Sequence, residues 1–465
     1  MTGDESAFEA VVEAVGERIA PDERERERLA EAVAVLRERA TDAVADLPVE
    51  ADLRQVGSTA RGTWISGDRD IDLFVRFPPD LPREDLEEYG LEVGHAVLPE
   101  GREEYAEHPY VVGEFDGFDV DLVPCYRLDS ATEIQSAVDR TPFHNDYVAK
   151  RLDPELAGEV RLFKQFLKGI GAYGSDLRTR GFSGYLTELL VLEHGSFRAT
   201  IEAAAEWHPP VRFDPEDHGR ADGADSTPGD AGEQFDDPLV VIDPTDPERN
   251  VAAVCAPENV ARLQHYAREL LDSPRESLFV AERVEPLTAD AVREHVRRRA
   301  TAPVAVRFDA PDVVDDQLYP QLRKSLDGLR EELDRRGFDV LRTAAFADES
   351  AALFAELEVA ERPAIERHEG PPVHVRDHAE GFYTKYADGD DYGPFVDGDR
   401  YVVERDREFS TAATFLESDA ILDVALGVRV ERELRTDYDV LVGEAVADLA
   451  EEFGRELARY FDPGP

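Results

Sequence analysis

The first part of the chain changes from a helical to a strand-like spacing of its apolar residues. Over residues 5–47 the apolar side chains recur at helical spacing, which predicts a helix with one buried face, Pro21 near a start and Pro48 at the end. Two β-like runs follow at 53–56 and 70–77, and in the second of these apolar and polar residues alternate. The helical stripe consists of Leu29, Val33, Leu36, Ala40 and Val44.

Two further β-rich runs, 110–115 and 118–126, flank an Asp-Gly dipeptide at 116–117. This dipeptide is a strong signal for a two-residue hairpin turn. In the second run the apolar residues alternate with Asp119 and Asp121, so both carboxylates are expected on one face of the strand. We therefore predict a β-hairpin that carries acidic side chains.

After residue 129 the pattern returns to helices. Residues 159–170 predict an amphipathic helix, and residues 181–197 predict a second, apolar helix after the glycine-rich turn 171–174. A Gly-, Pro- and Asp-rich stretch at 214–238 is interpreted as a mobile acidic insertion without a catalytic part. The buried face of the first helix is expected to hold Leu162, Phe163, Phe166, Leu167 and Ile170.

The last third of the chain predicts an α+β scaffold with little recognisable chemistry. A strand at 304–308, a helix stopped by Gly337 and a strand at 338–341 form a β-α-β unit. A closing helix is predicted over 442–460, because apolar residues recur there at helical spacing. We expect this part to contact a long substrate or a partner.

The composition of the chain says more about its possible binding partners than about its fold. The chain has 103 acidic and 52 basic residues, a net charge of −51, and 23 Phe and 15 Tyr, so it is acidic but not of a disordered type. Such acidity fits a cytoplasm at molar salt, where the Debye length is about 3 Å. The net charge therefore does not exclude a nucleic-acid partner, although any contact with one must be locally basic.

Two further observations exclude classes of protein. The sequence has no apolar run of eighteen or more residues and no apolar N-terminal segment, so we expect neither a membrane span nor a signal peptide. Its two cysteines, Cys125 and Cys255, lack the spacing of a disulfide framework or a zinc site. We expect both to be buried thiols in a reducing cytoplasm.

The candidate chemistry begins at Gly57 and Ser58, directly after the first β-like run. A Gly-Ser turn leaves backbone N–H groups and a hydroxyl free to hold phosphate oxygens. Twelve residues beyond Ser58, Asp70 and Asp72 project from one face of the next strand, and paired carboxylates suit a hard cation such as Mg²⁺. A polar-faced surface strand is the alternative for the Asp-x-Asp pair alone. With the turn at this spacing, the arrangement matches the nucleotidyltransferase superfamily signature, in which a later strand supplies a third carboxylate.

The hairpin supplies that carboxylate, and alternation alone does not choose between Asp119 and Asp121.

A second functional candidate is a basic stripe of Arg161, Lys164 and Lys168 on the helix predicted over 159–170. Only five basic residues are lysines, yet three of these, at 150, 164 and 168, fall within nineteen residues. In a chain that otherwise uses arginine, this favours a task for a compact ammonium group, and phosphate binding is the main hypothesis. An ordinary solvated helix face is the alternative.

Together, five motifs resemble those of the archaeal (class I) CCA-adding enzymes, which are tRNA nucleotidyltransferases. The resemblance covers most of residues 1–260 in the right order and the remainder more loosely. That family builds the tRNA 3′ CCA end from CTP and ATP without a nucleic-acid template. The motifs are GSTARGTW at 57–64, DID at 70–72, VDLVPCY at 120–126, RTPFH at 140–144 and RGFSGY at 180–185.

The resemblance implies a multidomain α+β fold. A nucleotidyltransferase-fold catalytic head with a mixed β-sheet is expected at 1–145. A helical nucleotide-binding neck with the acidic insertion follows at 146–260, and an α+β body and tail that bind tRNA follow at 261–465. The sequence leaves open whether the chain is a monomer or a homodimer.

The resemblance also implies roles for single residues. In relatives the first carboxylate is often Glu, so Asp70 is shorter by one methylene but remains an oxygen ligand. Asp121 is chosen over Asp119 because it occupies the family position before the Val-Pro-Cys-Tyr end of the strand. The expected roles are metal binding by Asp70, Asp72 and Asp121, triphosphate contact by Ser58 and Arg61, and nucleotide contact by His144, Lys164, Tyr173 and, in a less specific match, Arg249.

The predicted reaction is Mg²⁺-dependent addition of CCA to the tRNA 3′ end from CTP and ATP, with release of pyrophosphate. Two alternatives remain at this stage. One is a poly(A) polymerase-like transferase, which would add an open tail of A. The other is a catalytically silent RNA-binding relative, against which the three carboxylates argue.

Overall fold

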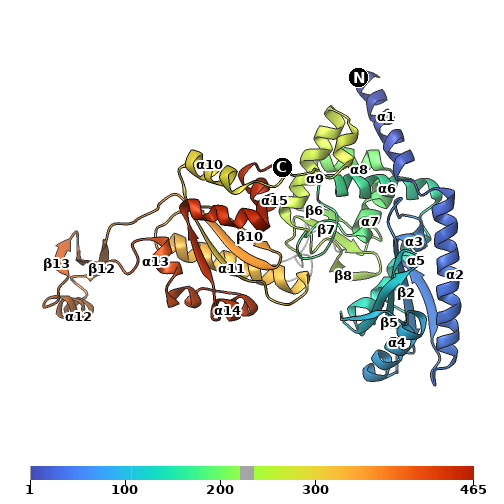
Figure 1. Cartoon of the computed structure of the whole chain (residues 1–465), viewed down its shortest axis with the longest axis horizontal. Helices are drawn as coiled ribbons and strands as arrows, with labels where there is room; N and C mark the ends of the chain where they lie inside the picture. The colour runs from blue at the N-terminus through green and yellow to red at the C-terminus, as the bar shows by residue number, and fades with distance from the viewer. Residues whose placement is uncertain (1, 106, 220–234) are drawn as a thin grey trace. The chain divides into compact units, whose positions relative to one another are not determined.

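The computed structural model describes residues 2–105, 107–219 and 235–465. The chain divides into two compact units, Met1–Glu282 and Arg283–Pro465, each built from helices and sheets (Figure 1). This confirms the multidomain α+β fold class. Most of the expected acidic insertion, residues 220–234, lies outside the described residues.

The first unit begins with a five-stranded mixed sheet in the order β1-β2-β5-β4-β3. Only β2 and β5 run parallel, and the other neighbours are antiparallel. The predicted hairpin is confirmed, since Asp116 and Gly117 both take positive φ angles, of 51° and 77°, between β4 and β5. The strands are β1 (Asp52–Val56), β2 (Asp70–Phe77), β3 (Arg102–Tyr105), β4 (Pro109–Phe115) and β5 (Phe118–Tyr126).

Two helices, α2 (Glu23–Ala45) and α4 (Arg83–Val97), cover one face of this sheet (Figure 1). The apolar residues of β2 and β5 alternate along each strand and join the helices in one core. The carboxylates of the same strands therefore lie on the opposite face. The core includes Leu29, Leu36, Ile71, Leu73, Val75, Val93, Val120 and Leu122.

The single helix predicted over 5–47 is wrong, because the structure has α1 (Thr2–Ile19) and α2 separated at 20–22. Pro21 disfavours a helical conformation for the residue before it, which ends the first helix. Asp22 then caps the second helix by accepting a hydrogen bond from Glu25 N at 2.7 Å, while Glu25 accepts one from Asp22 N. The continuous apolar spacing over 5–47 gave no sign of this break.

The remainder of the first unit is mainly helical and surrounds a separate apolar core. The predicted helix at 159–170 is confirmed as part of the longer α6, which starts at Pro154 behind the N-cap Asp153, and its predicted apolar face is buried. The helices are α3 (Gly57–Arg61), α5 (Thr141–Ala149), α6 (Pro154–Gly169), α7 (Gly184–His194), α8 (Phe197–Ala205) and α9 (Pro257–Asp272), with 3-10 turns η1 (Ala137–Arg140) and η3 (Glu276–Phe279).

The helix predicted over 181–197 is interrupted. Ser183 caps the start of α7, and Gly195 ends it in a left-handed conformation with φ 81°. Ser196 caps the next helix, so α8 begins at Phe197. Behind these helices a small sheet in the order β6-β7-β8 comprises β6 (Val211–Phe213), β7 (Leu239–Asp243) and β8 (Asp246–Asn250).

The second unit contains a four-stranded antiparallel sheet in the order β10-β11-β9-β15, with helices on both faces. The predicted β-α-β unit is present, and β11 lies between its two strands. The elements are α10 (Ala289–Arg299), β9 (Ala302–Asp309), α11 (Asp315–Arg335), β10 (Val340–Ala347), β11 (Ser350–Leu357), α13 (Ala412–Leu416), η4 (Asp419–Asp423), α14 (Val428–Leu434), β15 (Asp439–Val442), η5 (Gly443–Leu449) and α15 (Ala450–Phe461).

The closing helix predicted over 442–460 begins later than expected. Val442 ends strand β15 and is 44% exposed, and the chain passes through η5 before α15 starts at Ala450. The apolar spacing was right for the buried residues but included a strand residue in the helix. A smaller sheet, β12-β14-β13, and one helix complete the unit: β12 (Ile365–Pro372), α12 (Arg376–Tyr386), β13 (Tyr392–Asp397) and β14 (Arg400–Asp406).

The structure also bears on the two cysteines and on membrane-spanning helices. Cys125 and Cys255 are both buried and unpaired, as predicted. Within the described part of the chain, no helix is long and apolar enough to cross a membrane.

Candidate active site

The site is built on the pairing of β2 with β5. Because these strands are parallel and in register, Asp70 lies beside Asp119 and Asp72 beside Asp121. All four side chains project from the face opposite α2 and α4. Two pairs of carboxylates are therefore stacked along one face of the sheet.

These carboxylates open into a cavity of about 290 Å³. The cavity gathers six of the predicted site residues, although they come from two helices, two strands and a turn. Its lining consists of Ser58, Asp68, Asp70, Ile71, Asp72, Asp119, Asp121, Lys164, Lys168 and Tyr173.

The electrostatics of the cavity suit a cation. Burial raises the pKa of Asp72 to about 7, and repulsion from Asp121 and Asp70 adds to the shift. Burial, followed by the neighbouring acidic groups, raises the pKa of Asp121 to about 6. Burial and mutual repulsion thus disfavour the ionised forms of the three predicted metal ligands, and a bound cation would favour them. Oxygen-only donors are the set that Mg²⁺ prefers.

The carboxylates are not already drawn together around one point. Among residues 2–105, 107–219 and 235–465, no three His, Cys, Asp or Glu side chains form a ready-made metal cluster. The donor set fits Mg²⁺ in its chemistry.

On the other side of the cavity, two lysines of α6 share one carboxylate. Lys164 Nζ donates to Asp68 Oδ2 at 2.5 Å, and Lys168 Nζ donates to Asp68 Oδ1 at 2.9 Å. Both ammonium groups lie 5.5 Å from the ring centroid of Tyr173. Burial alone would raise the pKa of Asp68, but the two lysines outweigh it and hold that pKa below its ordinary value.

The Gly-Ser segment forms the start of a short helix and not the predicted turn. Gly57 has a φ angle of 80° and opens the five-residue helix α3 directly after β1. Ser58 lines the cavity. Arg61 ends α3 and points elsewhere: its Nε donates to Glu188 Oε1 at 2.9 Å and its Nη1 to Asn145 Oδ1 at 3.0 Å.

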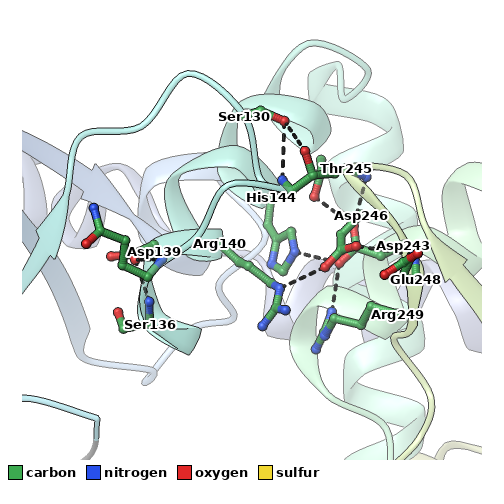
Figure 2. Close-up of polar contacts among 12 residues, drawn as sticks. Ser130, Ser136, Asp139, Arg140, His144, Asp243, Thr245, Asp246, Glu248 and Arg249 are labelled. Atoms are coloured by element: carbon green, nitrogen blue, oxygen red, sulfur yellow. Dashed lines mark hydrogen bonds and ion pairs between the residues drawn. The ribbon is translucent and has the colours of Figure 1, made fainter. Parts of the chain in front are cut away.

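Like Arg61, His144 and Arg249 are not among the described residues that line the cavity. Both contact Asp243 instead (Figure 2). His144 Nε2 and Arg249 Nη1 each lie 2.8 Å from Asp243 Oδ2. The His144 ring stacks on that of Tyr185, with centroids 4.0 Å apart. The structure thus joins these two predicted residues to each other, through a residue that the sequence analysis did not single out.

Two acidic residues of the site were missed, and each left a trace in the sequence. Asp68 precedes the strand of the Asp-x-Asp pair, so alternation along the strand could not identify it. The only signal was the pair of lysines on α6, since neighbouring ammonium groups favour an acidic partner. Asp243 ends the wholly buried strand β7, where a carboxylate needs buried partners.

The chain matches three family models in sequence order. They are described as a nucleotidyltransferase domain, over residues 37–144, the second domain of tRNA nucleotidyltransferase, over 158–280, and the C-terminal domain of the CCA-adding enzyme, over 299–443.

Curated relatives match over nearly the whole chain. A CCA-adding enzyme of Haloarcula marismortui is 62% identical over 98% of this chain and 99% of its own, and one of Halorubrum lacusprofundi is 61% identical over the same shares. A CCA-adding enzyme of Methanoregula boonei is 44% identical over 87% of this chain and 86% of its own.

Proposed function

The chain belongs to the CCA-adding enzymes, a family of tRNA nucleotidyltransferases, and from this premise we propose that it adds CCA to the tRNA 3′ end from CTP and ATP. One structural observation carries the proposal for this chain's own residues. The side-by-side carboxylates of β2 and β5 face two lysine ammonium groups across one cavity. Such a cavity suits a nucleoside triphosphate, because the carboxylates can bind its metal ion and the ammonium groups can contact its phosphate oxygens.

In the proposed reaction, the tRNA 3′-hydroxyl oxygen forms a bond to the α-phosphorus of the nucleotide. The bond from that phosphorus to the β-phosphate oxygen breaks, and pyrophosphate leaves. Asp70, Asp72 and Asp121 are assigned as ligands of Mg²⁺, which when bound activates the hydroxyl and neutralises triphosphate charge. The chain's own contribution is to position the reactants and to stabilise the negative charge of the phosphates with its cationic side chains.

The other residues are assigned by where they lie. Lys164 and Lys168 present ammonium groups to the triphosphate, and the Ser58 hydroxyl faces the same space. Tyr173 supports the lysines through its ring. Arg61 is assigned a less direct role, because its guanidinium is held by Glu188 and Asn145 and contributes to the site mainly by its charge near Asp72.

The domain roles of the family are proposed for this chain as well. We assign catalysis to residues 1–145, nucleotide binding to 146–260 and contact with the body of the tRNA to 261–465. The tRNA 3′ end, CTP and ATP are the proposed partners, and Mg²⁺ is the proposed cofactor.

The deciding experiment is an ordered-addition assay in high potassium and magnesium. The substrate is tRNA that lacks its terminal CCA, and CTP and ATP are offered singly and together. A tail of three ordered nucleotides with pyrophosphate release supports the proposal, whereas an open A tail supports a poly(A) polymerase-like activity. Binding of tRNA without pyrophosphate release supports a silent relative, and Asp72→Ala serves as the inactive control.

A further inference from the structure

Asp243 is a fully buried carboxylate that joins segments far apart in the sequence. It ends strand β7, and its side chain is 0% exposed. Its partners come from helix α5, helix α7, the following turn and strand β8. They are His144, Tyr185, Thr245 and Arg249.

The two oxygens of this carboxylate have different tasks. Oδ1 accepts from the backbone N–H of Thr245 at 2.9 Å and from its hydroxyl at 2.8 Å, and from the Tyr185 hydroxyl at 3.3 Å. These contacts fix the carboxylate to its own turn and to α7. Oδ2 is left for His144 and Arg249, each at 2.8 Å (Figure 2).

We propose that Asp243 is a positioning residue that holds His144 and Arg249 in one fixed arrangement for the incoming nucleotide. The inference rests on the proposed function and on the nucleotide contacts that the family resemblance implies for these two residues. It adds a residue, Asp243, that does not itself touch the nucleotide but determines how two others meet it.

The geometry determines which ring nitrogen of His144 faces Asp243, as well as the position of the ring. A carboxylate oxygen only accepts hydrogen bonds, so Nε2 of His144 must carry the proton. The ring cannot turn over without losing this bond, and its stacking on Tyr185, with an interplanar angle of 14°, fixes the plane of the ring. Partners of this kind fix the tautomer and orientation of functional histidines in metal sites, and the same argument applies here.

Exposure distinguishes the anchor from the groups that it holds. The Asp243 side chain is inaccessible, whereas those of His144 and Arg249 are 13% and 35% exposed, so their outer atoms can reach a ligand. The same turn holds α5 a second time, because Asp246 accepts from Arg140 Nε at 3.2 Å just before that helix begins (Figure 2). The β7–β8 turn therefore fixes the first turn of α5 at two points.

The second unit offers a matched control. Glu356 is also a buried carboxylate, and it accepts from Arg299, Thr301 and Tyr460. It has the same kinds of partner as Asp243, apart from the histidine, and lies outside the unit that contains the cavity. Glu356→Gln therefore reproduces the loss of a buried negative charge without changing His144 or Arg249.

The test measures KM for CTP and ATP, kcat, and direct CTP binding by calorimetry in the full chain at high salt. Asp243→Asn is expected to raise both KM values and the CTP dissociation constant by about 10- to 100-fold, in the range known for supporting residues, with kcat changed much less. Glu356→Gln is expected to leave all three unchanged. Thr245→Val, which removes one anchor of Oδ1, is expected to give a smaller rise and serves if Asp243→Asn does not fold.

A variant that lacks both His144 and Arg249 side chains distinguishes a positioning role of Asp243 from a general destabilisation of the fold. In a chain that carries His144→Ala and Arg249→Ala, adding Asp243→Asn should change CTP binding less than twofold. A full additional loss in that background, or an unchanged KM and CTP affinity in Asp243→Asn alone, would overturn the inference. A wild-type chain that adds no nucleotides counts against the proposed function instead, and the calorimetric comparison still judges the role of Asp243.

Discussion

Gly57 and Asp72 lie so close together that no side chain fits between them. A Cβ atom on Gly57 would lie 2.0 Å from Asp72 Oδ2 and 3.1 Å from its Cγ. The contact arises because β1 pairs with β2 so that Val56 lies opposite Asp72, and Gly57 follows at once with a φ angle of 80°. The glycine of the Gly-Ser motif therefore also makes room for a carboxylate of the proposed metal site.

Gly57→Ala should consequently disable the site. Alanine at this φ costs on the order of 1 kcal/mol in backbone strain, and its methyl group must also displace the Asp72 carboxylate. We expect nucleotide incorporation to fall by about 100-fold or more, since small displacements of catalytic groups have effects of that size. Gly62→Ala is the control, because Gly62 has a φ of 74° with nothing within 4 Å of its added Cβ. Equal losses in both variants would show that strain, not displacement of Asp72, is responsible.

The two carboxylates of β5 should differ in importance. Asp121 lies opposite Asp72 and is half-buried, whereas Asp119 lies opposite Asp70 and is exposed, although both line the cavity. Asp121→Asn is expected to lower kcat by about 100-fold or more because it removes a proposed metal ligand. Asp119→Asn is expected to lower it by less than about tenfold, through the loss of one nearby charge. Single-turnover rates at saturating nucleotide measure the difference, and the reverse order would assign the third ligand to Asp119.

The lysine pair should act on nucleotide affinity. Lys164→Met removes one of two ammonium groups in the cavity and leaves Asp68 with Lys168 alone. We expect KM for CTP and ATP to rise by about 10-fold or more, the loss of a charge-assisted contact, with a smaller change in kcat. Lys150→Met is the control, because Lys150 is exposed at the end of α5. If Lys164→Met leaves the apparent affinity unchanged, Lys164 does not belong to the site.

The strands of the catalytic sheet were predictable because one face is buried and the other carries charge. Alternation in β2 and β5 places each side chain on its face, and Asp116-Gly117 fixes the hairpin between β4 and β5. Helix boundaries were less accessible. The break before α2 depends on Pro21 and the cap Asp22, and the end of α7 on the left-handed Gly195, which are local signals inside longer apolar patterns.

The candidate site was predictable where its residues share a motif and less so where it depends on tertiary contacts. Asp70, Asp72 and Ser58 lie on one continuous stretch, and the lysine enrichment indicated Lys164. Asp68 and Asp243 become recognisable only when α6, α5 and β8 are brought to them, because their partners are about 100 residues away or on another element. A periodicity argument contains no information about such pairs.

The raised pKa of Asp72 predicts a pH-dependent cost that Mg²⁺ should remove. Since that pKa is about 7 in the folded chain and 3.8 ordinarily, the metal-free folded state binds a proton that the unfolded state has lost between these values. Its stability should therefore fall as pH rises from about 4 to 7 and change little above that range. Asp72→Asn has no such charge, so at pH 8 it should be more stable than the wild type by on the order of 2 kcal/mol, and near pH 4 by little. Urea unfolding at high KCl with a chelator measures this difference.

Magnesium provides the second half of the same prediction. Because the cation binds the ionised carboxylate, protons compete with it, and Mg²⁺ should stabilise the wild type more at pH 8 than at pH 5.5. Asp72→Asn should show a much smaller stabilisation at both values. A pH-independent difference between wild type and Asp72→Asn would mean that the pKa of Asp72 is not raised in the folded chain. An equal response of both to Mg²⁺ would mean that Asp72 is not a metal ligand.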